Sequence, residues 1–321
     1  MERRTFFGVV AGGLLTAPLA AEAQRATKVH RIGVLWYGPR DSRFEGFIQT
    51  LAELGFMEGR NLFVEFRTII LPQLSAQAAD LIRLNVDVLV TQATRATRAA
   101  MDQTRTIPIV MIGAADPVAT GVVASLHHPG GNVTGSTDMR PALTAKRVEL
   151  LKETVPTAKR VGALFDPTEP AVMQEWADTE TAARALGLVP VRMEVRHSEA
   201  IASAFARLTS DEGAILVVFT RAFTLTHRSR IIELADMHRI PTVGSGEFAK
   251  AGGLLGLGAN YVELLRRTAI LVDKILKGAK PSDLPVEQPT KFELVINRKT
   301  AHALGLTIPP SLLLRADQVI E

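Results

Sequence analysis

Short apolar runs alternate with longer amphipathic segments through most of the chain. The run at 107–112 is rich in β-branched residues, which is typical of a strand buried on both faces of a parallel sheet. The segment 44–54 places apolar residues at helical spacing and is followed by Gly55, a favourable residue just beyond a helix. In the first part of the chain the same criteria predict strands at 28–35, 61–67, 86–91 and 107–112, and helices at 44–54, 74–84 and 94–104.

The second part of the chain repeats this order. Residues 160–165 (RVGALF) parallel 31–36 (RIGVLW), and 239–243 (RIPTV) parallel 106–110 (TIPIV). Strands are also expected at 188–195 and 214–220, and the offset between matching segments stays between 127 and 133 residues. The predicted fold class is therefore α/β, with two Rossmann-like lobes whose parallel sheets are flanked by helices with right-handed crossovers.

The last part of the chain predicts further crossings between the lobes. Strands are expected at 254–257 and 292–296, helices at 261–276 and 298–304, and a short helix or turn after Pro309-Pro310. Crossings near 107–138, 244–260 and 280–292 would form a multi-stranded hinge. The predicted N-terminal lobe comprises 29–138 plus about 252–284, and the C-terminal lobe comprises 139–251 plus about 285–321.

The first 23 residues differ from the rest. Arg3 and Arg4 precede an apolar run at 6–20, and 21–23 (AEA) matches the small-x-small pattern at which signal peptidase cleaves. We expect 1–23 to be an export signal peptide that resembles a twin-arginine signal, with a general secretory signal as the alternative. Because the chain has no cysteine, neither disulfides nor a lipid anchor on a cysteine is expected. The expected location is the periplasm, as a soluble protein.

The composition argues against several kinds of chemistry. The chain has 47% hydrophobic and 22% charged residues, and its net charge of +4 is spread without a basic run, so no nucleic-acid partner is expected. The histidines show no metal-ligand spacing, and neither a phosphate-binding glycine loop nor a G-x-S-x-G nucleophile elbow follows a predicted strand. No cofactor, no metal and no enzymatic activity are expected.

Polar residues gather instead where the predicted strands end, the edge at which open α/β sheets bind ligands. Hydroxyls and helix N-terminal N–H groups suit a carboxylate, and aspartate or glutamate suits an ammonium. Alternatively, Ser42, Thr94 and Thr168 are helix N-caps, Asp116 and Asp166 are turn residues, and Trp36 is hinge packing. The candidate ligand-binding residues are Trp36, Tyr37, Ser42, Thr91, Gln92, Ala93, Thr94 and Asp116 in the first lobe, and Asp166, Thr220, Arg221 and Glu247 in the second.

Four motifs resemble a known family: 116–118 (DPV), 129–135 (PGGNVTG), 146–152 (KRVELLK) and the C-terminal stretch 274–321. They resemble the ABC transporter substrate-binding protein family that includes tryptophan- and tyrosine-binding members, and the likeness runs from about residue 31 to the C-terminus. The resemblance implies a type I periplasmic binding protein fold that captures a small ligand, with aromatic amino acids as the best-known ligand class. It also implies delivery to an inner-membrane permease with a cytoplasmic ATPase.

Three segments depart from the family pattern. Residues 92–95 (QATR) stand where members usually carry a Gly-Thr-Pro-Ala loop, 221–222 (RA) where they carry Asp-Pro, and 68–72 (TIILP) where the family is more polar. An additional cation at Arg95 or Arg221 favours a carboxylate-rich ligand. The ligand is therefore predicted only as an amino acid or an aromatic or carboxylic acid.

The predicted function is a monomeric solute-binding protein of an ABC import system. One alternative is an exported α/β enzyme that uses Asp116, Asp166 or Glu247 as acid or base, which would show turnover. The other is the ligand-sensing domain of a transcription regulator, which would need a DNA-binding helix-turn-helix where the export signal is predicted.

Overall fold

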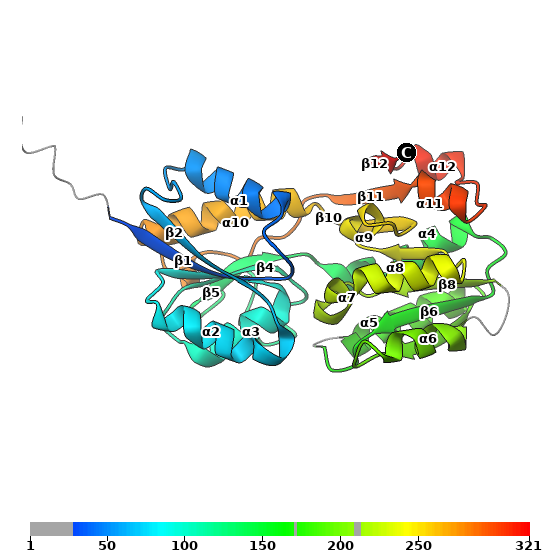
Figure 1. The fold of residues 1–321 in the computed structure, drawn as a ribbon, viewed down its shortest axis with the longest axis horizontal. Helices are drawn as coiled ribbons and strands as arrows, with labels where there is room; N and C mark the ends of the chain where they lie inside the picture. The colour runs from blue at the N-terminus through cyan, green and yellow to red at the C-terminus, as the bar shows by residue number, and fades with distance from the viewer. Residues whose placement is uncertain (1–27, 170–171, 209–212) are drawn as a thin grey trace, which may run out of the picture.

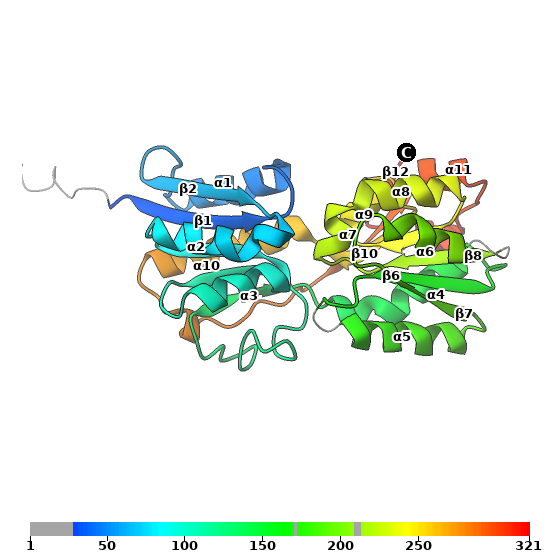
Figure 2. The same ribbon diagram turned by 60° about the horizontal axis from the view of Figure 1, so that its bottom comes forward.

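Two β-sheets divide the protein into two lobes that lie end to end (Figure 1). The computed structural model describes residues 28–169, 172–208 and 213–321, so the predicted signal peptide at 1–23 lies outside the described residues. The predicted fold class is confirmed, because each lobe has a parallel sheet with helices on both faces, as Figure 2 shows from a second side.

Lobe one contains a fully parallel sheet in the order β2-β1-β3-β4-β5. On one face α1 and α10 pack together, where Leu51 and Leu265 belong to the same apolar core. On the other face lie α2 and α3, which contribute Leu81 and Ala96 to a second core. The elements in chain order are β1 (His30–Trp36), α1 (Ser42–Glu53), β2 (Leu62–Thr68), α2 (Leu74–Arg83), β3 (Val88–Gln92), α3 (Ala93–Gln103), β4 (Ile109–Ala114) and β5 (Val133–Thr137).

Lobe two contains a larger sheet in the order β12-β11-β10-β9-β8-β6-β7. Its apolar cores lie on the two faces, under α4 and α5 on one side and under α6 and α8 on the other. The elements are α4 (Thr144–Thr154), β6 (Arg160–Phe165), α5 (Val172–Ala185), β7 (Val189–Glu194), α6 (Ala200–Leu208), β8 (Ala214–Val218), α7 (Ala222–Thr226), α8 (Arg228–Met237), β9 (Thr242–Gly244), α9 (Gly246–Lys250), β10 (Leu255–Ala259), then α10 (Tyr261–Leu276) in lobe one, and β11 (Phe292–Asn297), α11 (Arg298–Ala303), α12 (Pro310–Leu313) and β12 (Gln318–Ile320).

The internal repeat is visible in the strand order. The first five strands are arranged as β2-β1-β3-β4-β5, and the next five as β7-β6-β8-β9-β10. After the fifth strand of each lobe the chain enters the other lobe, so α4 follows β5 into lobe two and α10 follows β10 into lobe one. Each lobe is thereby completed by a helix from beyond its own repeat.

The predicted lobe boundary near 252 is wrong for β10. This strand pairs with β9 and β11 in the sheet of lobe two, so the crossing into lobe one comes at Asn260. The return comes after Glu287, whose N–H donates to the carbonyl of Gly135 in lobe one at 2.8 Å. Strand pairing over long distances decides lobe membership, and a local hydrophobic pattern carries no such information.

Strand β11 is antiparallel to its neighbour β10, and the path of the chain explains why. The chain returns from lobe one at the interlobe edge, so β11 must run away from that edge and pairs antiparallel with β10. The short strand β12, which pairs with β11, was not predicted from the sequence.

Gly135 lies where β5 meets β4, and its φ of 135° is in the region that favours glycine. A Cβ there would overlap the backbone of Met111 on β4. We expect Gly135→Ala to lower the free energy of unfolding by about 2 kcal/mol or more, because both strain and overlap act at a buried strand. Denaturant unfolding followed by circular dichroism measures the change.

The control is Gly46→Ala on α1, where a Cβ meets nothing within 4 Å. Alanine has the higher helix propensity, so this variant should unfold at equal or higher denaturant concentration. If both variants were equally stable, the close packing assigned to Gly135 would be wrong.

Candidate functional site

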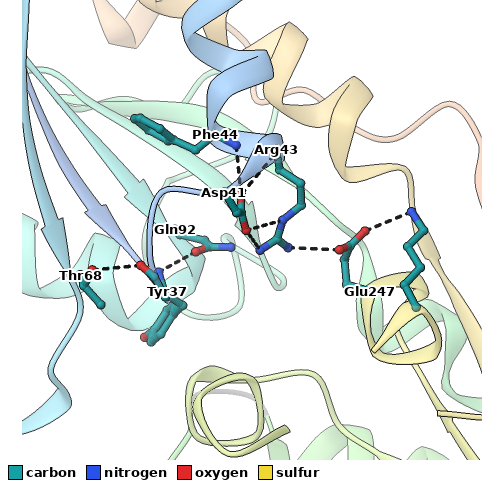
Figure 3. Close-up of polar contacts among 9 residues, drawn as sticks. Tyr37, Asp41, Arg43, Phe44, Thr68, Gln92 and Glu247 are labelled. Carbon is teal, nitrogen blue, oxygen red and sulfur yellow. Dashed lines mark hydrogen bonds and ion pairs between the residues drawn. The ribbon is translucent and has the colours of Figure 1, made fainter. Parts of the chain in front are cut away.

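The two lobes contact each other across the edge at which their parallel strands end. Arg43 on α1 lies 3.6 Å from Glu247 on α9. Figure 3 draws this ion pair between the two lobes. At a second place, Arg95 on α3 donates to the Thr168 hydroxyl at 3.0 Å and lies 3.5 Å from Glu169 and 3.6 Å from Asp166. These contacts join residues of different lobes, so the structure represents a closed arrangement.

A cavity of about 260 Å³ lies between the lobes, and we call it the interlobe cavity. Lobe one contributes Tyr37, Gly38, Pro39, Arg43, Thr68, Ile69 and Gln92, and lobe two contributes Leu225, Thr226, Arg228 and Ser229. A second hollow of about 170 Å³, the hinge cavity, is lined by residues that include Asp138, Thr220, Ser245, Glu247 and Tyr261.

The wall from lobe one is fixed by hydrogen bonds between its loops. The N–H of Tyr37 donates to the side-chain carbonyl of Gln92 at 2.8 Å, and the Thr68 hydroxyl donates to the Gly38 carbonyl at 3.0 Å (Figure 3). These bonds hold the loops after β1, β2 and β3 against one another. Tyr37 and Gln92 are thereby presented to the cavity on a fixed backbone.

Arg43 is held in place by Asp41, the N-cap of α1. Asp41 accepts from the N–H groups of Arg43 and Phe44 at 3.1 Å, and from Nε of Arg43 at 2.9 Å. Burial alone would raise the pKa of Asp41, but the Arg43 guanidinium and these N–H groups hold that pKa below its usual value. The Asp41–Arg43 pair is therefore ionised at neutral pH.

Strained backbone is concentrated at this edge of lobe one. Ala93, Asp116 and Met139 have φ values of 65°, 36° and 49°, and they directly follow or lie close behind β3, β4 and β5. Such conformations cost roughly 1 to 3 kcal/mol each and cluster at ligand-binding sites. The other two non-glycine residues of this kind among the described residues, Asn85 and Arg239, follow helix ends.

A buried charge network supports the wall from lobe two. Arg147, fully buried, donates to the Leu257 carbonyl at 2.8 and 3.1 Å, and its guanidinium lies 3.7 Å from the Glu175 carboxylate. Glu175 also accepts from Arg221, which is 4% exposed. Removal of one partner from such a network leaves an uncompensated buried charge, so the three side chains depend on one another.

This network corrects the expectation that Arg221 or Arg95 adds a free cation to the ligand site. The guanidinium of Arg221 is engaged by Glu175, and that of Arg95 faces Asp166 and Glu169. Both positive charges are compensated by protein carboxylates in the closed arrangement.

The remaining predicted residues fall into two groups. Tyr37 and Gln92 line the interlobe cavity, Thr220 and Glu247 line the hinge cavity, and Asp166 belongs to the Arg95 contact. The others belong to the framework of lobe one. Trp36 is fully buried against Phe44, Ser42 is exposed beside the N-cap Asp41, and Ala93 begins α3. The Thr91 hydroxyl hydrogen-bonds that of Thr97, Thr94 accepts from the Ala115 N–H, and Asp116 accepts from the Ala119 N–H.

Sequence reasoning missed Arg43, Arg228, Asp138 and Tyr261. Tyr261 had a usable signal, because the chain has only two tyrosines and the other, Tyr37, was selected partly on that ground. Asp138 also had a signal, because it directly follows the strand β5. Arg43 and Arg228 depend on which helix face points to the opposite lobe, and this is set by the tertiary arrangement.

A two-lobed protein with a cavity between lobes, several crossings and polar strand ends has the architecture of a solute-binding protein. Residues 34–320 match the ABC transporter substrate binding protein family, and the chain belongs to that family. The resemblance noted from the motifs is thus confirmed.

Three related proteins are similar along most of their length. A tyrosine-binding protein of Clostridioides difficile (strain R20291) is 27% identical over 269 residues, covering 83% of this chain and 77% of the relative. The crystal structure of a conserved domain protein from Vibrio cholerae O1 biovar El Tor has a TM-score of 0.84 at 28% identity. An ABC domain from Streptococcus pneumoniae in complex with L-Trp has a TM-score of 0.83 at 28% identity. Each alignment to these two structures covers 91% of this chain and all of the other.

Two negative findings apply to the described residues alone. None of their helices is long and apolar enough to cross a membrane. No group of three or more histidine, aspartate or glutamate side chains among them is placed to hold a metal ion.

The Arg95 contact predicts an effect on lobe closure. Arg95→Met removes the links to Asp166, Thr168 and Glu169, so we expect a larger radius of gyration for the ligand-free protein in small-angle X-ray scattering. Because the side chains of Asp166 and Glu169 are only 6% and 4% exposed, the closed state of the variant would hold two buried carboxylates without this cation, so opening should be favoured. Arg98→Met is the matched control, since it removes an exposed arginine of α3 that makes no ion pair with a described residue. Equal scattering from both variants would contradict the assigned contact.

Glu169 predicts a pH effect on stability. Burial raises the pKa of this carboxyl, although Arg95 and Arg221 oppose the rise. Its contribution to stability is therefore fully present below the unfolded pKa and is lost as the pH rises through the folded pKa. Glu169→Gln cannot ionise, so its unfolding free energy relative to the parent should increase between about pH 4 and pH 7.

Urea unfolding at several pH values measures this difference. A constant difference for Glu169→Gln would mean that its folded pKa is not raised.

Proposed function

We propose that this protein is the periplasmic receptor of an ABC import system. It binds one small organic ligand, an amino acid or an aromatic or carboxylic acid, between its lobes. It delivers the ligand as a monomer to an inner-membrane permease with a cytoplasmic ATPase. The observation that carries the proposal is the interlobe cavity, whose lining is shared by both lobes of a chain that belongs to the substrate-binding family.

Closure about the hinge is the mechanism of capture. A ligand in the interlobe cavity contacts Tyr37 and Gln92 of lobe one and Leu225 of lobe two together only when the lobes are closed. The ligand therefore stabilises the closed state through contacts that the open state lacks. The closed surface is the form offered to the permease.

Tyr37 is the proposed aromatic contact. It is 7% exposed and lines the cavity beside Ile69 and Leu225, so one side of the cavity is apolar. The relatives that bind tyrosine and L-Trp support an aromatic ligand for this chain. Thr220 and Glu247, which were predicted as contacts from lobe two, line the hinge cavity instead, and Glu247 is engaged by Arg43 and Lys250.

The test is ligand binding to the mature protein, residues 24–321, which is unfolded and refolded first to remove any ligand that copurifies. Thermal-shift screening covers amino acids, aromatic acids and dicarboxylates, because a ligand that binds only the folded state raises the melting temperature. Calorimetry of each hit should give one site per chain, and the ligand should be recovered unchanged. Conversion of the ligand would favour the enzyme alternative instead.

Tyr37→Ala should weaken binding of the identified ligand roughly tenfold, because the ring contact is lost, while Tyr37→Phe should weaken it less. Calorimetry on folded, monodisperse protein separates this effect from any loss of stability. An unchanged affinity for Tyr37→Ala would place the ligand outside the interlobe cavity.

A further inference from the structure

We infer that Arg228 is the anion-binding residue of the interlobe cavity and that the ligand is a carboxylic acid without an α-ammonium group. This inference rests on the proposed receptor function and names its substrate class. Arg228 is half-buried, begins α8, and faces the cavity from lobe two, opposite Tyr37 and Gln92 of lobe one.

Arg228 differs from the other arginine of the cavity. Arg43 is compensated by Asp41 and Glu247, whereas Arg228 makes no ion pair or side-chain hydrogen bond with any residue in the described ranges. A guanidinium that is partly removed from water and has no protein partner favours an anion as its partner, and its planar shape suits a carboxylate.

The residues around Arg228 place no opposing acid at the start of α8. The first turn of α8 contains no acidic residue, and the N-cap His227 provides no side-chain hydrogen bond to the helix. His227 is also the C-cap of α7, so the ends of two helices with opposite dipoles meet there and the positive charge comes from the Arg228 side chain. Burial lowers the pKa of His227, against the opposing effect of Glu199, so the imidazole is neutral at neutral pH and the arginine supplies the charge.

The cavity offers no matching site for an ammonium. No aspartate or glutamate is among its lining residues. Two acids beyond this lining are engaged by cations, because Glu247 faces Arg43 and Lys250, and Asp166 faces Arg95. An α-amino acid would bring its ammonium between two arginines with no carboxylate to receive it, and an unpaired charge in such a site is strongly unfavourable.

The volume of the interlobe cavity and its apolar residues further define which ligands fit. A cavity of about 150 Å³ accommodates benzene, so about 260 Å³ accommodates a ring with a short acid side chain. The ring is expected against Tyr37, Ile69 and Leu225, and the carboxylate on Arg228. The assigned ligand class is thus an aromatic or similarly bulky monocarboxylic acid.

Calorimetry with ligand pairs that differ only in the amino group tests the class. The pairs are phenylalanine with 3-phenylpropanoate, tyrosine with 3-(4-hydroxyphenyl)propanoate, and tryptophan with indole-3-propanoate. In at least one pair the acid without the amino group should bind at least about tenfold more tightly. Tighter binding of the amino acids would overturn the inference and leave the receptor function intact. Absence of binding by these compounds and by the wider screen would overturn both.

Substitutions of Arg228 test whether this residue binds the carboxylate. Arg228→Met should weaken binding of the acid at least about tenfold, and Arg228→Lys should weaken it less. The primary amide of the same acid should bind the parent and Arg228→Met equally, so the preference for acid over amide should vanish in the variant. Arg230→Met, which removes an exposed arginine of α8 paired with Glu233, is the control and should retain the parent affinity. A preference for the acid that survives in Arg228→Met would show that the carboxylate binds elsewhere.

Discussion

The strands β1 to β5 and β6 to β10 all run toward the boundary between the lobes, and this common direction fixes where ligand chemistry is possible. Loops at the carboxyl ends of both sheets meet there, and the chain also crosses between lobes there. The left-handed backbone at Ala93, Asp116 and Met139 is found at the same edge. A local cost in conformational energy is tolerated because the sheets behind these loops are held by large apolar cores.

The arginines near the cavity differ in whether a carboxylate of the protein lies close enough to pair with them. Arg147 and Arg221 share Glu175 inside lobe two, and Arg95 faces two acids across the boundary. These side chains therefore hold backbone segments and lobes in position. Arg228 differs from these arginines, because no acid among the described residues pairs with it. Ligand selectivity then depends on one position of α8 more than on the buried arginines behind it.

Helices and strands were predicted well where the local hydrophobic pattern alone determines the element. The helix at 261–276 and the strand at 160–165 have the bounds observed for α10 and β6. The repeat also followed from the sequence, because equivalent strands keep the same order in both lobes. The lobe of β10 did not follow, since its partners β9 and β11 are distinguished from the strands of lobe one only by long-range pairing.

The candidate site was predicted at the level of loops, and its individual residues were less predictable. Trp36 and Tyr37 are adjacent, and residues that follow each other at a strand end point to opposite faces. Trp36 consequently joins the core with Phe44 under α1, while Tyr37 joins the opposite core and reaches the cavity. Arg221 was selected as a cation at a strand end, but the buried Glu175, 46 positions earlier in the chain, turns it inward.

The rim contacts set a limit on how far the protein closes without ligand. Arg43–Glu247 and Arg95 with its acids are largely withdrawn from water, with side-chain exposures of 13% and 27% for the two arginines and 4% for Glu169, so the desolvation cost offsets most of the attraction and the net gain is small. A shift from a mostly open to a mostly closed population requires about 5.5 kcal/mol. The rim pairs therefore align the lobes, and the larger part of the closing free energy must come from a ligand in the cavity. A receptor built in this way presents its closed surface mainly when it is loaded, because the cation at Arg228 has its partner only then.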